Sequence, residues 1–405
     1  MKCEWHRISD YVSSGEIEIR TGPFGTQLRA SDYVASGIPV INVRNIGYGT
    51  INEEKLEYID EQTAMRLSMH LLRTNDIVFG RKGAVDRHAF IVEKYNGWLQ
   101  GSDCIRLRVN TKKLLPQYLS YYFLTKRHKG FMESMCSHGS TMASLNQKIL
   151  EKIEFPYVSV ENQMKIVDVL SAIDRKVMVN RNINANLQQQ AQAIFKSWFV
   201  DFEPFQDGEF VESELGPIPK GWRVGELSEV ATITMGQSPS GKSYNEEGNG
   251  SVFFQGRAEF GDRFPTRRLY TTEPKRMAEA NSVLMSVRAP VGDINVAYEK
   301  CCIGRGLASI QSKFEYSSYM LYQMLSLKRQ LDVFNGEGTV FGSINRDTLN
   351  AMKVLIPNED SIEKFECTVA PMDKLVRANY DEICRLETAR DTLLPKLMNG
   401  EIEVQ

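Results

Sequence analysis

The chain carries the same sequence pattern twice, and this duplication constrains its fold more than any other feature. The aligned segments are residues 139–146 (GSTMASLN) with 338–345 (GTVFGSIN), 173–177 (IDRKV) with 372–376 (MDKLV), 40–44 with 253–257, and Trp5 with Trp222. The first two pairs stand at one common offset, called the repeat offset below. With 405 residues, the chain has room for two such halves, each with its own core. Two related halves with different variable stretches predict one scaffold that presents two different binding surfaces.

Four segments follow from the distribution of apolar residues and turn formers. Residues 1–157 and 204–358 alternate short strand-like runs with Gly-rich turns, whereas residues 158–203 and 359–405 have few turn formers and a helical period. The predicted fold class is therefore α+β, with two pseudo-symmetric globular α/β domains separated by two long antiparallel, coiled-coil-like helices.

The two helical segments share one hydrophobic seam. Apolar residues recur at alternating spacings of four and three, with asparagines near the middle, where a buried amide would fix the register of pairing. The residues expected to pair the helices are Leu170, Ile173, Val177, Asn180, Leu187, Met372, Val376, Asn379 and Leu386. Pro371 and Pro395 can each start or kink a helix, so a break near residue 371 stays open. Another open alternative is two ordinary amphipathic helices, each packed onto its own domain.

Charge and composition place the chain among ordinary cytoplasmic proteins. No apolar run is long enough to span a membrane, the N-terminus lacks an apolar signal core, and the seven cysteines show no CxxC spacing, so a zinc site is not expected. Residues 1–157 carry 21 Lys and Arg against 17 Asp and Glu (+4), whereas residues 359–405 carry 6 against 11 (−5). The whole chain, at −2, would hold phosphates weakly by itself. We therefore expect partner subunits to supply much of the positive surface.

The search for catalytic motifs gives no convincing active site. Residues 236–243 (GQSPSGKS) match the phosphate-loop pattern, but the loop-like sequence after them does not predict the required helix. The Asn/Asp-Pro-Pro-aromatic loop of amino methyltransferases is missing, and the five histidines show no ligand spacing. We expect no metal or cofactor site in this chain.

The loops of both halves, in contrast, are rich in side chains that can read DNA bases. Arg can bond bidentately to guanine, Asn or Gln to adenine, and hydroxyl groups to either. The candidate DNA-binding residues are Asn42, Arg44, Asn45, Arg81, Lys82, Arg87, His138, Ser140, Thr141, Gln255, Arg257, Arg263, Arg267, Arg268, Arg288 and Thr339. Polar Gly-rich loops are common on any protein surface, so the argument depends on their recurrence in both halves.

These strings together resemble the specificity (S) subunits of type I restriction–modification systems. The resemblance covers essentially the whole chain and depends on residues 235–239 (MGQSP), 37–41 (GIPVI), 75–79 (NDIVF), 161–163 (ENQ) and 393–397 (LLPKL), in this order and with the duplication. Arg390, at a seam position where Leu or Ala is expected, departs from the pattern.

The resemblance implies a DNA-recognition subunit without catalytic activity of its own. Residues 1–157 and 204–358 would be two target recognition domains, each reading one half of a split double-stranded DNA sequence. Residues 158–203 and 359–405 would be spacer helices that set the gap and dock two methyltransferase subunits and the restriction subunits. S-adenosylmethionine, ATP and Mg would be bound by those partners. The alternatives are a self-contained methyltransferase or nuclease of related architecture, and a repeat-built adaptor without a DNA role.

Overall fold

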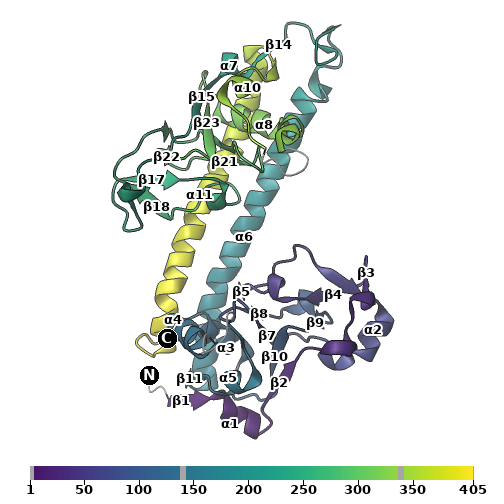
Figure 1. The fold of residues 1–405 in the computed structure, drawn as a ribbon, viewed down its shortest axis with the longest axis vertical. Helices are drawn as coiled ribbons and strands as arrows, with labels where there is room; N and C mark the ends of the chain where they lie inside the picture. Colours follow the sequence, from purple (N-terminus) through teal and green to yellow (C-terminus); the bar gives the residue numbers. More distant parts are fainter. Residues whose placement is uncertain (1–3, 137–142, 336–341, 405) are drawn as a thin grey trace. The chain divides into compact units, whose positions relative to one another are not determined.

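The computed structural model describes residues 4–136, 143–335 and 342–404. The chain divides into two compact units, residues 1–179 with 382–405 (unit 1) and residues 180–381 (unit 2). Figure 1 shows that each unit contains its own sheets and a segment of each long helix, α6 (Val160–Phe199) and α11 (Glu359–Met398). The unit boundaries therefore fall inside the two helices and not at their ends.

Unit 1 is built on two sheets and a short strand pair. The first sheet has the order β2-β10-β7-β8-β5, the second has the order β3-β6-β4-β9, and β1 pairs with β11. The strands are β1 (Glu4–Arg7), β2 (Ile17–Thr21), β3 (Tyr33–Val34), β4 (Ile38–Ile41), β5 (Tyr48–Gly49), β6 (Glu57–Ile59), β7 (Ile77–Gly80), β8 (His88–Phe90), β9 (Leu99–Gln100), β10 (Cys104–Val109) and β11 (Glu154–Tyr157). The helices are α1 (Ile8–Ser13), α2 (Glu61–Arg66), α3 (Pro116–Phe123), α4 (Lys126–Cys136) and α5 (Gln147–Glu151).

Unit 2 repeats this plan. Its sheets have the orders β15-β23-β20-β21 and β16-β18-β17-β22-β19, and β14 pairs with β24. The strands are β14 (Arg223–Glu226), β15 (Ala231–Met235), β16 (Tyr244–Asn245), β17 (Ser251–Phe254), β18 (Leu269–Thr271), β19 (Met277–Ala278), β20 (Val283–Ser286), β21 (Ile294–Val296), β22 (Cys301–Ile303), β23 (Leu307–Ser312) and β24 (Lys353–Ile356). The helices are α7 (Leu227–Val230), α8 (Ser317–Ser326), α9 (Lys328–Asp332) and α10 (Arg346–Asn350), and a two-strand pair, β12 (Phe210–Val211) with β13 (Ile218–Pro219), follows α6.

The register of the strands shows how closely the halves correspond. Trp5 faces Pro156 in one strand pair, and Val224 faces Leu355 in the other. Because Pro156 and Leu355 correspond at the repeat offset, Trp5 corresponds to Val224. The alignment of Trp5 with Trp222 is therefore two residues out of register along the strand and is wrong.

The segment GSTMASLN/GTVFGSIN ends in the same helix cap in both halves. The side chain of Asn146 accepts a hydrogen bond from the backbone N–H of Ile149, and that of Asn345 accepts one from Thr348. An asparagine at this position satisfies an N–H group that the first turn of a helix leaves without a partner. The duplicated asparagine thus has a structural reason.

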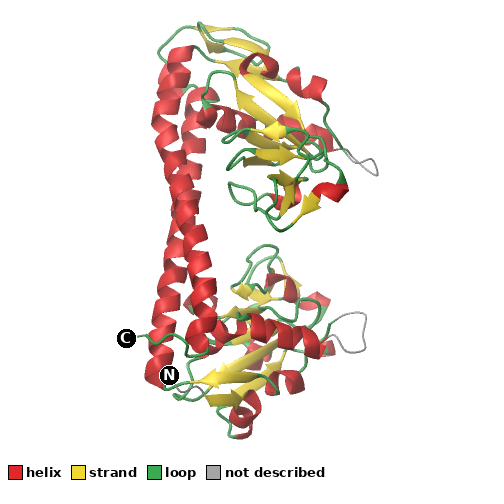
Figure 2. Ribbon diagram, turned by 90° about the vertical axis from the view of Figure 1, so that its left-hand side faces the viewer, coloured by secondary structure: helices red, strands yellow, loops and turns green. Residues whose placement is uncertain are grey.

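Each unit buries apolar residues from its own segments of the two long helices in its core. Figure 2 draws both long helices in red. In unit 2, Phe195 lies 5.6 Å from Phe365 between ring centres, and Asn184 donates to the carbonyl oxygen of Val376. In unit 1, Asp174 of α6 forms an ion pair with Arg390 of α11. Partner numbers on α11 fall as those on α6 rise, so the helices pair antiparallel within unit 2, and the α+β fold class is confirmed.

The residues expected in the seam lie on the inner face of the helices. Leu170, Val177, Asn180, Val376 and Asn379 are buried, and Ile173, Leu187, Met372 and Leu386 are half-buried. Asn379 donates to Oδ1 of Asn184 at 2.8 Å, and Nδ2 of Asn184 donates to the carbonyl oxygen of Val376, so both buried asparagines take part in hydrogen bonds between the helices that favour one register. Helix α11 is continuous through Pro371 and Pro395, both of which are exposed, so the suggested break near residue 371 is not found. None of the helices in the described part of the chain is long and apolar enough to cross a membrane.

Candidate nucleic-acid interface

The loop after β4 and the loop after β17 present matched polar side chains. β4 pairs in parallel with β9 (Val40 opposite Leu99), and β17 pairs in parallel with β22 (Phe253 opposite Cys302). The two loops therefore leave equivalent strands, and each begins with an amide side chain, Asn42 or Gln255, followed two positions later by Arg44 or Arg257.

Both arginines are half-exposed and held by one carboxylate. Arg44 forms an ion pair with Glu57 at 3.0 Å, and Nδ2 of Asn42 donates to the same carboxylate at 2.6 Å. Arg257 pairs with Asp293. Exposed pairs of this kind contribute little free energy. The carboxylate can therefore position the guanidinium group before binding, and a guanine or a phosphate can then replace the carboxylate as its partner.

Asn45 is a correction to the predicted site. Its side chain is fully buried, and Nδ2 donates to the carbonyl oxygens of Asn52 and Glu54 at 3.0 and 3.1 Å. Its Oδ1 accepts from the backbone N–H of Asn42. Asn45 therefore shapes the loop from inside and offers no group to DNA. Buried Glu259 has the same role in the second loop, where its carboxylate accepts a hydrogen bond from the backbone N–H of Gly256.

A second pair of matched loops follows β7 and β20. Lys82 forms an isolated bridge with Ser144, and Arg288 forms one with Ser343, in each case just before the capping asparagine. Lys82 is exposed and pairs with Asp103 at 3.2 Å, whereas exposed Arg288 has no ion-pair partner among the residues that the structure describes. In unit 1 this loop lies against the first one, because a Cβ on Gly80 would sit 3.2 Å from Cγ1 of Val43.

The remaining candidates of this loop in unit 1 lie over aromatic rings. The guanidinium carbon of Arg81 is 4.7 Å from the ring centre of Phe24, and that of Arg87 is 5.4 Å from that of Tyr48. Nζ of Lys129 lies 4.1 Å from the same Tyr48 ring. The sequence search missed Tyr48 and Lys129, although the repeat offset aligns Lys129 with Lys328, which lies 3.8 Å from Asp293 in unit 2. The duplication is the sequence signal that could have identified the matched lysines Lys129 and Lys328.

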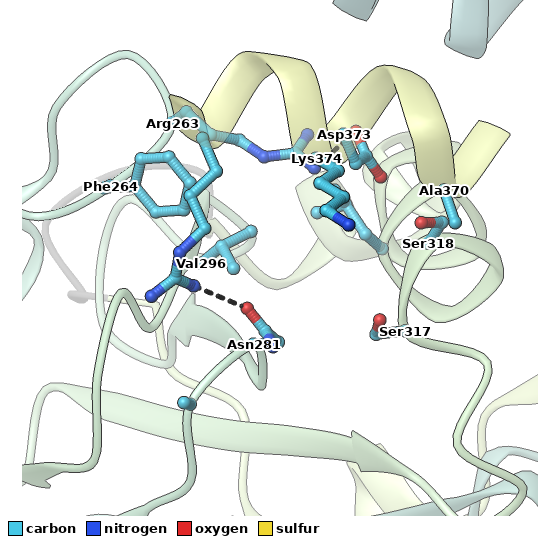
Figure 3. A pocket seen from close by; sticks show the side chains of 12 residues that line it. Arg263, Phe264, Asn281, Val296, Ser317, Ser318, Ala370, Asp373 and Lys374 are labelled. Atoms are coloured by element: carbon cyan, nitrogen blue, oxygen red, sulfur yellow. Dashed lines mark hydrogen bonds and ion pairs between the residues drawn. The ribbon is translucent and has the colours of Figure 1, made fainter. Parts of the chain in front are cut away.

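Arg263 is the second correction. Its side chain is 10% exposed, and Nη2 lies 2.7 Å from Oδ1 of Asp373 on α11. Figure 3 shows Arg263 reaching toward Asp373 across the top of a pocket that Phe264 and Lys374 also line. Arg263 therefore ties the recognition loop of unit 2 to the helix and is not available to read a base.

Its neighbours Arg267 and Arg268 stay candidates because both are exposed. Arg267 pairs with Glu299 at 2.6 Å, and Arg268 pairs with Glu259 at 3.1 Å. Four further candidates lie outside the described residues: His138, Ser140, Thr141 and Thr339.

The phosphate-loop match has a different structural reason. Gly236 lies so close to the opposite loop that a Cβ there would be 2.1 Å from the carbonyl oxygen of Gly304, and a Cβ on Gly22 would be 1.9 Å from that of Gly101. Only glycine fits such an approach. After Gly236 the chain forms a short 3₁₀ turn (Gly241–Ser243) and then β16, so the helix that would cradle a phosphate does not follow. No cluster of three or more His, Cys, Asp or Glu residues that could hold a metal occurs in residues 4–136, 143–335 and 342–404.

The sequence comparisons agree with this duplicated, loop-bearing architecture. The family described as "Type I restriction modification DNA specificity domain" matches residues 22–189 and 219–364, one region in each half. The putative type I restriction enzyme MjaX specificity subunit of Methanocaldococcus jannaschii is 31% identical over 377 residues, which cover 91% of this chain and 88% of that protein. The HindI specificity subunit of Haemophilus influenzae is 22% identical over 400 residues, which cover 82% of this chain and 87% of that protein.

A solved structure supports the fold. The S subunit of a type I restriction–modification system from M. genitalium superposes with a TM-score of 0.58 at 15% identity, covering 98% of this chain and 96% of that one. The chain belongs to the family of type I restriction–modification DNA specificity subunits. It is a DNA-recognition subunit and not an enzyme, because methylation and cleavage in such systems are carried out by other subunits. It functions in a complex with methyltransferase and restriction subunits and DNA.

Proposed function

We propose that each unit reads one half of a bipartite double-stranded DNA target. The observation that carries this proposal is the matched pair of exposed arginines, Arg44 and Arg257, at equivalent loop positions of two units whose other loop residues differ. Around them, Asn42, Arg81, Lys82 and Arg87 stand in unit 1, and Gln255, Arg267, Arg268 and Arg288 stand in unit 2. The same scaffold with different side chains would give two different half-sites.

The direct test compares Arg44→Ala with Arg257→Ala in the assembled complex. A bidentate arginine–guanine contact discriminates by about 1–3 kcal/mol, so each variant should relax the preference at one half-site by roughly 5- to 150-fold and leave the other unchanged. Binding to DNA duplexes with single changes in either half-site measures this. Arg7→Ala is the matched control, since Arg7 forms a similar exposed pair with Glu154 away from these loops. Equal damage to both half-sites would contradict separate reading.

We also propose that α6 and α11 fix the spacing of the two half-sites and dock two methyltransferase subunits and the restriction subunits. Support comes from the two continuous 40-residue helices and the amide pair that fixes their register. The methylation cofactor S-adenosylmethionine, and the ATP and Mg of translocation, would then belong to those partners.

A heptad inserted within 177–187 tests this ruler. The insertion lengthens α6 by about 10 Å, roughly three base pairs, so the tolerated spacer should change or assembly should fail. Mapping of methylated bases on genomic DNA measures the spacer. An insertion of the same length at 246–250, in the exposed loop between β16 and β17, should leave the spacer as it was. A helix insertion with an unchanged spacer and full methylation would refute the ruler.

A further inference from the structure

Three basic side chains at the start of α4, Lys126, Arg127 and Lys129, line one hollow on the surface of unit 1. Lys126 and Arg127 are exposed, and Lys129 is half-buried. None of these three, called the α4 patch below, forms an ion pair with a described residue. The other charged residues of the lining, Arg390 and Asp391, pair with each other at 2.9 Å. The hollow therefore keeps a positive charge that the described part of the chain does not compensate.

Two members of the α4 patch are held by aromatic rings. The guanidinium carbon of Arg127 lies 3.8 Å from the ring centre of Trp5, and Nζ of Lys129 lies 4.1 Å from that of Tyr48. Both rings are themselves exposed, at 40% and 44%. The face of a ring attracts a cation without neutralising its charge, whereas a carboxylate neutralises it and occupies its N–H donors. The rings thus orient these cations and leave their charge and donors available to an anion.

The cations of the recognition loops are arranged differently. Arg44 pairs with Glu57 at 3.0 Å, and Lys82 pairs with Asp103 at 3.2 Å. A base edge is read by direction, which a carboxylate partner can impose, whereas a phosphate is held mainly by charge. The α4 patch has the charge without the carboxylates. Its composition therefore fits phosphate groups better than bases.

The α4 patch is continuous with the recognition surface of unit 1. Tyr48, whose ring lies under Lys129, comes directly after the loop that carries Arg44. The same ring lies 5.4 Å from the guanidinium carbon of Arg87, and the Tyr48 hydroxyl donates to the carboxylate of Asp86 at 2.7 Å. Because base edges in a groove are flanked by the phosphates of both strands, a duplex read by this loop brings phosphates to the surface beside it.

We propose that Lys126, Arg127 and Lys129 bind phosphates of the target duplex beside the half-site that unit 1 reads. The patch contributes affinity and orientation, and the loops contribute the sequence. An acidic segment of a partner subunit would be the competing occupant. The ring that Lys129 shares with Arg87 favours DNA, because it joins the patch to a candidate DNA-binding side chain. This inference rests on the proposed reading of one half-site by unit 1.

The test removes two of the charges with Lys126→Gln/Lys129→Gln in the assembled complex. The matched control, Lys112→Gln/Lys152→Gln, removes the same charge from two exposed lysines of unit 1 that do not line the hollow. Affinity for the target duplex is measured over a range of salt concentrations. The patch variant should bind roughly 10- to 100-fold more weakly at about 0.1 M salt and have a salt slope shallower by about 2. Duplexes with a changed half-site should lose the same factor, and the control should match wild type.

Two further measurements separate a phosphate contact from a general loss of charge or a folding defect. Lys126→Arg/Lys129→Arg keeps both charges and should retain the wild-type slope. Phosphates of the target are also replaced one at a time by neutral methylphosphonates. At one or more phosphates beside the half-site that Arg44 reads, the replacement should weaken the wild-type complex and leave the patch variant unchanged, because a lost contact cannot be lost twice.

The outcomes that overturn the inference are distinct from those that affect the proposed function. Equal slopes in patch and control variants overturn it, and so does the absence of any phosphate whose replacement affects wild type alone. Failure of the patch variant to assemble with the methyltransferase and restriction subunits also overturns it, because the hollow would then be a protein contact. If the wild-type complex shows no half-site preference, the proposed reading itself fails. A preserved preference with an unchanged slope removes only the phosphate contact.

Discussion

The two units hold an aspartate at the same place on their long helices and use it differently. Asp174 and Asp373 correspond at the repeat offset, and each accepts a hydrogen bond from a tyrosine of the neighbouring helix, Tyr121 or Tyr322, at 2.8 and 2.9 Å. The arginine that forms an ion pair with the aspartate differs between the units. In unit 1 it is Arg390 of the antiparallel helix, and in unit 2 it is Arg263 of a recognition loop.

This difference shows that one helix position can serve two kinds of attachment. In unit 1 the ion pair joins helix to helix, and it explains why Arg390 interrupts the apolar seam. In unit 2 it joins the recognition domain to α11, where Arg377 adds hydrogen bonds to Asn281 and to the carbonyl oxygen of Tyr298. The recognition surface of unit 2 is therefore anchored to its helix by side chains that unit 1 does not have at the corresponding positions.

The cores differ as well. His88 and His128 are fully buried in unit 1, and His88 shares a hydrogen bond of 2.8 Å with Ser120, while neither ring nitrogen of His128 has a hydrogen-bond partner among the described residues. In unit 2, Ile294 takes the place of His88, since it faces Met285 as His88 faces Phe79. Leu327 and Leu331 are buried one helical turn apart in that unit, as His128 and Met132 are on α4. One half thus carries polar rings where the other is apolar.

The largest expected difference between the two units is their loss of stability in mild acid. Burial lowers the pKa of both His88 and His128 to about 3, below the unfolded value of about 6.5. The unfolded state then binds more protons, so unit 1 loses stability as pH falls below about 6.5, by about 2 kcal/mol per histidine at pH 5. Burial raises the pKa of Glu366 in unit 2, which acts in the opposite direction. Pulse proteolysis in urea at pH 7.5 and pH 5, with fragments assigned to each unit by mass, measures the difference.

His128→Leu provides the control for this prediction. It places in unit 1 the residue type of Leu327 and should remove about half of the acid loss. Equal acid losses in the two units, or an unchanged loss in the variant, would contradict the assignment to these rings.

The next largest effect should come from the aspartates. Asp373→Ala leaves Arg263 unpaired and 10% exposed, which should cost unit 2 about 3 kcal/mol. Asp174→Ala leaves Arg390 25% exposed and still beside Asp391, so unit 1 should lose about 1 kcal/mol. Hydrogen exchange of each unit in the two variants compares them. If Asp174→Ala costs as much as Asp373→Ala, the anchor argument for unit 2 is wrong.

The smallest effect should distinguish the matched cations Lys82 and Arg288. Each stands at the same bridge, but Asp103 already neutralises Lys82, whereas Arg288 has no such partner in the described part of the chain. Arg288→Ala should therefore weaken DNA binding of the assembled complex by about 1 kcal/mol and lower the salt slope by about 1, and Lys82→Ala should do less. Binding measured over a range of salt concentrations tests this. A larger slope change for Lys82→Ala would reverse the comparison.

The sequence predicted the architecture because duplication and helical periodicity are local signals. The repeat predicted two related units, and the alternating spacing of four and three predicted the buried faces of α6 and α11, with Asn180 and Asn379 among them. The alignment of residues 40–44 with 253–257 also placed Arg44 and Arg257 correctly on equivalent loops. What failed at this level was the register of Trp5. The open question of a break near Pro371 needed the structure, in which helix α11 accommodates this proline on an exposed face.

The sequence by itself determined that the two halves are related and which faces of the long helices are buried, because a repeat and a hydrophobic period can be read directly along the chain. Only the tertiary structure decided that Asn45 lies inside its loop and that Arg263 is bound to Asp373. The reason is physical. Whether a polar side chain faces solvent or a partner depends on groups brought together from distant positions, and residue type alone does not record them.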